Sequence, residues 1–146
     1  MIVKMMKIDR EHWSVDWIPI SYKLTDKQMR ESLVFLWSEN EIVNAMCRCY
    51  YISKTRVELG DLWINEAYRG KTYRDGLNYS LVLLKRVISK IWRAYPCAKA
   101  ITLVVAKDNV RAIRLYDRLH FDIVKSVDVP SLNIKNGVLM RRTKIA

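Results

Sequence analysis

Hydrophobic residues recur at helical spacing in one long stretch of the chain. Leu77, Leu81, Leu84, Ile88 and Ile91 follow one another at intervals of 4, 3, 4 and 3 residues, and the basic residues between them fall on other faces. This spacing places the apolar side chains on one side of an α-helix. We therefore expect an amphipathic helix that packs this side against a core.

Shorter hydrophobic runs on both sides of this helix have β-strand character. Residues 41–52 and 56–65 are separated by only three residues, which predicts two adjacent antiparallel strands joined by a hairpin. Residues 101–106 form a nearly continuous apolar run, as in a central strand that is buried on both faces. The order strand, helix, strand indicates a crossover connection.

The N-terminal part of the chain has a less regular pattern. Residues 1–8 and 17–24 each have a partial strand pattern. Thr25 and Gln28 have the spacing of a capping box, and apolar residues follow them at helical spacing. A helix is therefore expected over residues 26–38.

The C-terminal part predicts another helix and two strands. The helix is expected over residues 109–119 and the strands over 121–129 and 138–144, with Asn136 and Gly137 as turn residues. These elements together predict an α/β fold in which helices flank a single mixed, mostly antiparallel sheet. The 146 residues contain no repeat or linker, so one domain over residues 1–146 is expected.

The positive charge lies entirely in the second part of the chain. Residues 1–65 hold nine Lys or Arg and nine Asp or Glu, whereas residues 66–146 hold 17 and six, which accounts for the net charge of +11. An anion is therefore expected to bind the second part. Nucleic acid and a small polyphosphate-bearing cofactor are the two candidate classes.

Cysteine and histidine usage argues against disulfides and metal. The three cysteines make an odd number, without the paired spacing of a disulfide framework or a zinc site, and the two histidines lack partner ligands. No apolar run approaches the roughly 18 residues of a membrane span. We expect a cytoplasmic protein with reduced thiols, no metal and no membrane partner.

The segment after the strand at residues 101–106 carries the most specific pattern in the chain. The pattern is N-x-x-A-x-x-x-Y-x-x-L-x-F, formed by Asn109, Ala112, Tyr116, Leu119 and Phe121. It resembles a motif of the GNAT superfamily of acetyl-CoA-dependent N-acetyltransferases, which has a glycine before the final phenylalanine. His120 replaces that glycine here, at a turn where positive φ is convenient and His is tolerated better than a branched residue.

A second segment, residues 62–71, reads L-W-I-N-E-A-Y-R-G-K and resembles the strand and loop before the pyrophosphate-binding turn of that superfamily. After the R-G pair the chain departs from the superfamily pattern R-G-x-G-x-G. Without a gap, Thr72 and Arg74 occupy the glycine positions, and with four extra residues Gly76 and Asn78 occupy them. We favour the longer loop, which also aligns the paired leucine positions of the next helix.

The resemblance extends over residues 57–142 and implies a GNAT-like fold with acetyl-CoA as cofactor. Pyrophosphate needs several backbone N–H groups at the positive end of a helix, with no side chain at the closest approach. The residues expected to contact the cofactor are Ile64, Arg69, Gly70, Lys71, Thr72, Gly76, Leu77, Asn78 and Asn109.

The resemblance also implies direct attack of an amine on the thioester, which would lie between two splayed strands at residues 62–65 and 103–106. A backbone N–H near Ile64 would polarise the thioester carbonyl. Tyr116 lies where the superfamily has its general acid, and it would protonate the departing thiolate. Tyr116 is therefore the first catalytic candidate.

A carboxylate or a water chain must take the proton of the attacking amine. Asp61 is the leading candidate, because it lies eight residues before Arg69, where small-amine acetyltransferases of the superfamily often carry an acid. Glu58 is the second choice. The two should face opposite sides of a strand unless a bulge at Gly60 intervenes.

The acceptor is not defined by these motifs. Polyamines and other small amines, peptide or protein amines, and aminoglycosides are all open, for a monomer or a homodimer. The alternative is a non-catalytic basic module that binds nucleic acid or a protein on a GNAT-like scaffold. Nucleic acid is not expected, because no basic and aromatic repeat for stacking on single strands occurs.

Overall fold

The computed structural model describes residues 1–7, 25–74, 76–129 and 134–145. In these residues the main chain forms a seven-stranded sheet in the order β1-β2-β3-β4-β7-β9-β8. Its strands are β1 (Val3–Lys7), β2 (Leu33–Glu39), β3 (Ile42–Ser53), β4 (Arg56–Ile64), β7 (Ala100–Ala106), β8 (Asp122–Val129) and β9 (Ile134–Thr143). Only β4 and β7 pair in parallel among these described strands. The prediction of a mixed, mostly antiparallel sheet is confirmed.

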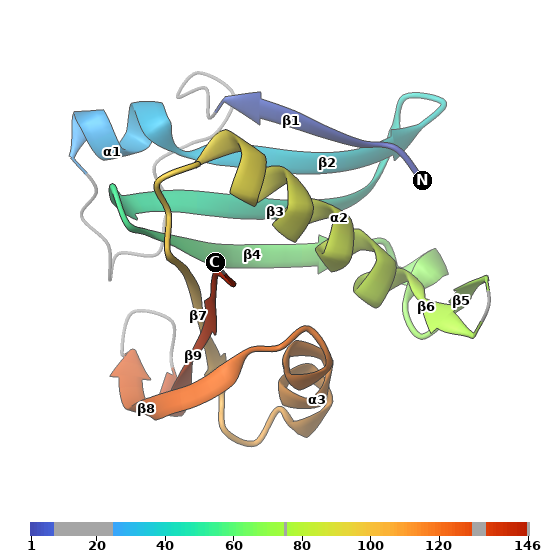
Figure 1. Cartoon of the computed structure of the whole chain (residues 1–146). Coiled ribbons are helices and arrows are strands. Elements are labelled where there is room, and N and C mark those ends of the chain that lie inside the picture. The colour runs from blue at the N-terminus through green and yellow to red at the C-terminus, as the bar shows by residue number, and fades with distance from the viewer. Residues whose placement is uncertain (8–24, 75, 130–133, 146) are drawn as a thin grey trace.

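Helices lie against this sheet, and a small hairpin stands apart from it. The helices are α1 (Asp26–Glu31), the short 3-10 helix η2 (Glu66–Tyr68), α2 (Tyr79–Ala94) and α3 (Val110–Arg118), and the hairpin consists of β5 (Thr72–Arg74) and β6 (Leu77–Asn78). Figure 1 shows α2 crossing β3 and β4, and α3 lying beside β8 and β9 in the lower half of the view. β4, α2 and β7 form the predicted crossover connection.

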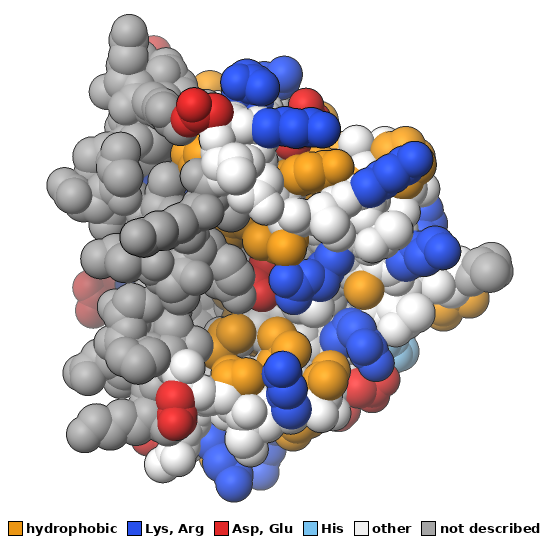
Figure 2. All heavy atoms as spheres, turned by 90° about the vertical axis from the view of Figure 1, so that its left-hand side faces the viewer, with side chains coloured by type: hydrophobic (Ala, Val, Ile, Leu, Met, Phe, Trp, Pro, Cys, Tyr) orange, Lys and Arg blue, Asp and Glu red, His pale blue; other side chains and the backbone are white. Residues whose placement is uncertain are grey.

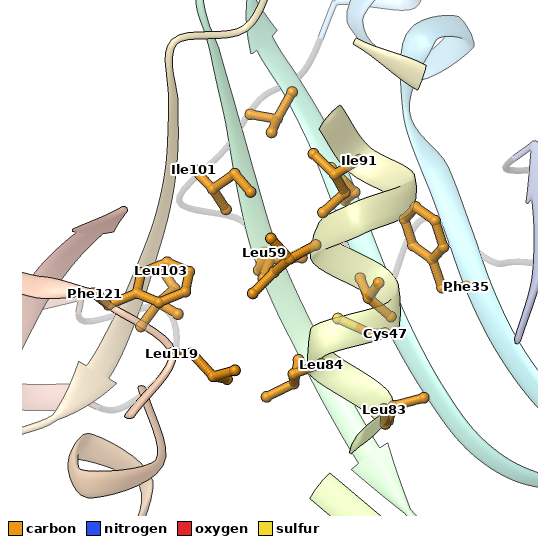
Figure 3. Close-up of a cluster of buried hydrophobic side chains, with 14 of the residues drawn as sticks. Phe35, Cys47, Leu59, Leu83, Leu84, Ile91, Ile101, Leu103, Leu119 and Phe121 are labelled. Carbon is orange, nitrogen blue, oxygen red and sulfur yellow. The ribbon is translucent and has the colours of Figure 1, made fainter. Parts of the chain in front are cut away.

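The core lies between α2 and the sheet. The predicted apolar side of α2 is buried, and Leu81, Leu84, Ile88 and Ile91 are each no more than 2% exposed. Figure 3 shows this cluster between the helix and the strands. Burying a side chain of this size stabilises the fold by about 1.5 to 3 kcal/mol, so this face fixes the position of the helix.

The helix predicted over residues 26–38 is confirmed only in its first part. The capping box forms, with the Gln28 N–H donating to Thr25 Oγ1 at 3.1 Å and the Thr25 N–H donating to Gln28 Oε1 at 2.8 Å. The helix ends at Ser32, whose hydroxyl donates to the Gln28 carbonyl at 2.7 Å and accepts the N–H of Tyr51 at 2.9 Å.

The prediction is wrong from residue 33, where β2 begins. This strand pairs with β1 on one edge and β3 on the other, and its Val34, Phe35 and Trp37 are all nearly fully buried. Because both faces are covered, apolar residues do not alternate along it. The same run therefore also fits a helical spacing, and long-range pairing decides between the two.

Two further predictions concern the ends of the chain. The strand predicted within residues 1–8 is confirmed as β1, whereas the one predicted at 17–24 lies outside the described residues. The turn predicted at Asn136 and Gly137 is wrong, because Gly137 lies inside β9 and pairs with Ala106 of β7 and Val127 of β8. Turn chemistry is here overridden by pairing on both edges of the strand.

Candidate active site

β4 and β7 are neighbours for only part of their length. Arg56 pairs with Ala100 and Glu58 with Thr102, and the parallel pairing ends there. Beyond this point β7 turns away from β4 (Figure 1) and pairs with β9 as far as Ala106. The predicted splay between these two strands is confirmed, and it opens the sheet next to α3.

A cavity of about 360 Å³ lies in this opening. Most of the residues that line it are hydrophobic, Tyr116 and Asn109 add polar side chains, and backbone atoms contribute to the polar part of its wall. A hollow lined mainly by hydrophobic residues with a few placed polar groups is typical of a ligand site. The residues that line this inner cavity are Cys47, Leu59, Gly60, Leu62, Leu84, Leu103, Val104, Val105, Ala106, Asn109, Ala112 and Tyr116.

Tyr116 lies on α3 and faces the inner cavity. Its ring contacts Phe121 edge-on, with the ring centroids 5.9 Å apart. Burial, and to a smaller extent the nearby Cys47 thiol, raise the pKa of Tyr116 to about 12. The phenol is therefore protonated throughout the ordinary pH range and can act as a donor toward the cavity.

Hydrogen bonds close in sequence fix both ends of α3. The Asn109 side chain accepts the Ala112 N–H at 3.2 Å and caps the first turn. At the other end, the His120 N–H donates to the Asp117 carbonyl and the Phe121 N–H to the Tyr116 carbonyl, both at 3.0 Å. His120 has a φ of 66°, so the expected positive φ at this glycine position is confirmed.

A second, outer cavity of about 670 Å³ shares Asn109 and Ala112 with the inner one. Arg111, Arg114 and Arg118 of α3 line it, together with Gly70, Asn78, Ser80, Val110 and Leu115. The two cavities are therefore neighbours with Asn109 and Ala112 in common. Three arginines line the outer cavity, and Tyr116 lines the inner one.

These three arginines were not among the residues expected from the sequence. Their spacing of three and four residues places them on one side of a helix, and this signal was available in the sequence. What the sequence did not supply was the partner element, because only the fold places this side of α3 opposite Gly70 and the start of α2.

Of the loop residues predicted to contact the cofactor, two line a cavity and the others do not. Gly70 and Asn78 line the outer cavity, and Gly70 has a φ of 68°. A Cβ added at Gly70 would lie 3.2 Å from Arg111 Nη2, so glycine keeps this approach open. Asn78 caps α2 by accepting the Leu81 N–H at 2.7 Å.

The remaining loop residues do not line either cavity. The four extra residues form the β5–β6 hairpin, in which Thr72 pairs with Asn78, and Leu77 pairs across the turn. Gly76 has a φ of 73° in this turn, and nothing lies within 4 Å of an added Cβ. Lys71 is exposed, and its carbonyl accepts the N–H of the first helical residue at 3.3 Å.

Arg69 and Ile64 contact each other. Arg69 Nε donates to the Ile64 carbonyl at 2.7 Å, which fastens the loop to the end of β4. Ile64 itself is 8% exposed and lies outside the lining of both cavities. Leu62 is the residue of the predicted stretch 62–65 that faces the inner cavity.

β4 has an irregularity where the two candidate bases lie. Trp63 pairs with Met46 and Gly60 with Arg48, so one residue more lies on β4 than on β3 between these pairs. This is a β-bulge, as anticipated near Gly60, and the strict alternation of Glu58 and Asp61 does not hold across it. The side chain of Asp61 lies outside the described part of the structure.

Glu58 lies at the last paired position before β4 and β7 part. It is 4% exposed, and its carboxylate accepts the Thr102 hydroxyl at 3.1 Å. Thr102 in turn accepts from Arg56 at 3.4 Å. The carboxylate is therefore held in place next to the opening of the sheet.

The described residues contain no group of His, Cys, Asp and Glu that could hold a metal ion. No helix among them is long and apolar enough to cross a membrane. None of the three cysteines forms a disulfide. On the face in Figure 2, Lys and Arg side chains are spread between hydrophobic ones, without a single basic patch.

Comparison with solved structures gives the same fold. The ribosomal-protein-S18-alanine N-acetyltransferase of Escherichia coli matches with a TM-score of 0.66 at 14% identity, over 99% of this chain and 96% of that chain. A GNAT family acetyltransferase of Elizabethkingia anophelis with acetyl-CoA bound matches with a TM-score of 0.64 at 12% identity, over 97% and 98%.

A spermidine N-acetyltransferase of Vibrio cholerae, as an F149A mutant, matches with a TM-score of 0.63 at 15% identity. The match covers 77% of this chain and 66% of that one, so the chain spans about two thirds of the length of this relative. No curated protein matches the sequence significantly.

Sequence comparison with protein families is more specific. The model of the acetyltransferase (GNAT) family matches residues 2–121. This range includes the splayed strands, the loop, α2 and the motif on α3. The chain therefore belongs to the GNAT acetyltransferase family.

Proposed function

We propose that the chain is an N-acetyltransferase that transfers an acetyl group from acetyl-CoA to a primary amine by direct attack. The observation that carries this proposal is the pair of neighbouring cavities along α3, one lined by Arg111, Arg114 and Arg118 and the other by Tyr116. When bound, acetyl-CoA supplies the activated acetyl thioester and leaves as the free thiol.

The described residues fit this cofactor. Phosphate groups prefer cations and helix N-termini, and the outer cavity offers three arginines and the first turn of α2 at Ser80. Gly70 leaves this cavity free of a side chain that would approach Arg111. We assign the phosphates to Gly70, Asn78, Ser80 and the arginines, and the pantetheine arm to the inner cavity.

The structure gives less support than the sequence pattern for cofactor contacts by four loop residues, Lys71, Thr72, Gly76 and Leu77. They belong to the inserted hairpin and its approach, outside the lining of both cavities. Arg69 is engaged with the Ile64 carbonyl. We propose that Arg69 and Ile64 together fix the shape of the loop. We propose that a backbone N–H of β4 near Leu62 and Ile64 polarises the thioester carbonyl.

Tyr116 is proposed as the proton donor to the leaving sulfur. With a pKa of about 12, Tyr116 enters each turnover protonated. Because a thiol has a pKa of about 8.5, full transfer of the phenol proton to a free thiolate is uphill. Tyr116 therefore acts as a hydrogen-bond donor whose bond strengthens as negative charge develops on the sulfur, and the released thiolate takes its proton from water.

The proton of the amine is assigned to a carboxylate of β4. Asp61 remains the candidate from the sequence pattern, and Glu58 has the support of its fixed position beside the opening of the sheet. The substitutions Asp61→Asn and Glu58→Gln separate them. Loss of the acidic limb of the pH profile of kcat/KM, where the base becomes protonated, identifies the base, and an unchanged profile in both variants assigns the step to water.

The acceptor is proposed to be a small amine such as a polyamine, with a peptide α-amine as the competing class. The spermidine and ribosomal-protein enzymes that share the fold are named for acceptors of these two kinds. A thiol-release assay over spermidine, an alanine-terminated peptide and an aminoglycoside distinguishes them by kcat/KM.

Calorimetric titration with acetyl-CoA tests the whole proposal. Binding at micromolar to sub-millimolar concentration is expected for a cofactor held by several charge-assisted contacts. No binding below millimolar concentration would reject the enzyme and favour a binding module on the same scaffold.

A further inference from the structure

Cys47 occupies a particular place in the inner cavity. It is the residue of β3 in the cavity lining, it is 1% exposed, and its Sγ lies 3.7 Å from the Gly60 carbonyl oxygen. Tyr116 lines the same cavity, and the Cys47 thiol is close enough to influence its ionisation. The thiol therefore lies in the same cavity as Tyr116, and the three arginines line the other cavity.

Small residues and a widened strand pair meet at this point. Cys47 lies directly opposite the bulge of β4, between the pairs of Met46 with Trp63 and of Arg48 with Gly60. Gly60 contributes only backbone to the lining, and a Cβ there would lie 2.9 Å from Tyr50 Cε2, outside the cavity. Cys47 supplies the side chain of β3 to this part of the lining.

Larger side chains close the cavity around Cys47. Leu59 of β4 and Leu84 of α2 line it as well, and Figure 3 shows all three in the space beneath α2. Both leucines belong to the tightly packed core, where each is no more than 7% exposed. Cys47 belongs to the same packed core but has the smallest of the three side chains, so a substitution there changes the size of this end of the cavity without removing a large core side chain.

We propose that the size of the Cys47 side chain sets the length of the acyl group that the site accepts from its acyl-CoA donor. This inference rests on the proposed acetyl-transfer function, because Tyr116 then marks the position of the thioester sulfur. An acyl group on that sulfur extends by one carbon at a time toward the wall that Cys47 forms. A larger residue at this position excludes propionyl and butyryl groups, and a smaller residue admits them.

Three substitutions at Cys47 and one control test this role. Cys47→Ala enlarges the cavity, Cys47→Val reduces it, and Cys47→Ser nearly preserves its size while removing the thiol. Cys49→Ala is the matched control, because Cys49 is also fully buried on the same face of β3 but does not line the cavity. Calorimetry gives Kd for CoA, acetyl-CoA, propionyl-CoA and butyryl-CoA, and the thiol-release assay gives kcat/KM for the three donors.

One methylene in an apolar site changes affinity by about tenfold, and this sets the expected size of the effect. In Cys47→Ala, the ratio of the propionyl-CoA Kd to the acetyl-CoA Kd falls about fivefold to tenfold, and in Cys47→Val it rises by a similar factor. Cys47→Ser and Cys49→Ala keep the ratio of the unmodified chain. The Kd of unacylated CoA stays within about twofold in every variant.

Two results would overturn the inference while leaving the proposed function intact. One is an unchanged ratio in both Cys47→Ala and Cys47→Val with normal CoA binding. The other is a changed ratio in Cys47→Ser, which would assign the effect to thiol chemistry rather than size. Failure of CoA to bind the unmodified chain would overturn the proposed function, and this inference with it.

Discussion

The segment at residues 109–121 and the loop at 69–78 both border the outer cavity, but different forces hold them. The segment is fixed by hydrogen bonds among its own residues, at the Asn109 cap and at the turn around His120. The loop has the pairing of its own hairpin, but residues outside it fasten it to the rest of the chain. Arg69 binds a carbonyl of β4, and Tyr73 stacks edge-on against Tyr79 and accepts a hydrogen bond from the Met1 amine.

This difference explains why the family pattern predicts the positions of the residues in the first segment better than those in the loop. A segment that caps itself keeps its geometry wherever the motif occurs, so the sequence places its Asn109 and Tyr116 in the cavities. A loop held by remote contacts can accept an inserted hairpin, and its residues then leave the positions that the pattern assigns. Chemistry is therefore expected to depend on α3, and shape on the loop.

The largest expected effect is the loss of the Tyr116 hydroxyl. Tyr116→Phe lowers kcat about 100-fold, because a positioned proton donor contributes a factor of this order, and it leaves the Kd of acetyl-CoA within about twofold. The same change in the loop, Tyr73→Phe, is the control and keeps kcat within about twofold. Steady-state thiol release measures both, and an equal loss in the two variants would contradict the assignment of chemistry to α3.

The next effect concerns cofactor affinity. Arg111→Gln or Arg114→Gln raises the Kd of acetyl-CoA about tenfold, since a charge-assisted hydrogen bond contributes about 1.5 kcal/mol. Lys71→Gln removes the same charge from the loop but lies outside the cavity lining, so its effect is about twofold or less. Calorimetric titration at two salt concentrations compares the Kd of acetyl-CoA among these variants. A change in Kd for Lys71→Gln as large as that for the arginine variants would mean that the loop contacts the phosphates.

Two glycines in the loop separate shape from binding. Gly70→Ala and Gly76→Ala both place a Cβ at positive φ, which costs about 1 kcal/mol of folding stability in each case. Only at Gly70 does the added methyl meet Arg111, so only this variant also weakens acetyl-CoA, by about threefold. Denaturant unfolding and calorimetry are the measurements, and equal Kd values would show that Gly70 serves the turn alone.

The smallest effect is a dependence of stability on alkaline pH. The pKa of Tyr116 is raised in the folded chain to about 12, so its contribution to stability is complete below pH 10 and is lost as the pH rises toward 12. Between pH 9 and pH 11 the free energy of unfolding therefore falls by roughly 1 kcal/mol more in the unmodified chain than in Tyr116→Phe. Urea unfolding at the two pH values measures this difference, and parallel losses in both chains would mean that the phenol is not desolvated.

Much of the fold followed from the sequence because its signals are local. The amphipathic α2, the β3–β4 hairpin, the buried β7 and both ends of α3 depend on spacing, capping and turn residues within a few positions. The errors fell where pairing on both edges overrides a local preference. β2 was assigned to a helix because both of its faces are buried, and Gly137 was assigned to a turn although β9 lies between β7 and β8.

For the site, the sequence by itself pointed to Asn109 and Tyr116 on a self-capped helix and to a basic second half. Only the tertiary structure decided that Arg111, Arg114 and Arg118 line one cavity with Gly70, and that Cys47 lines another with Tyr116. The reason is physical. A cavity is bounded by elements far apart in sequence, so its lining depends on where β4 and β7 part and on how α2 and α3 pack around the opening.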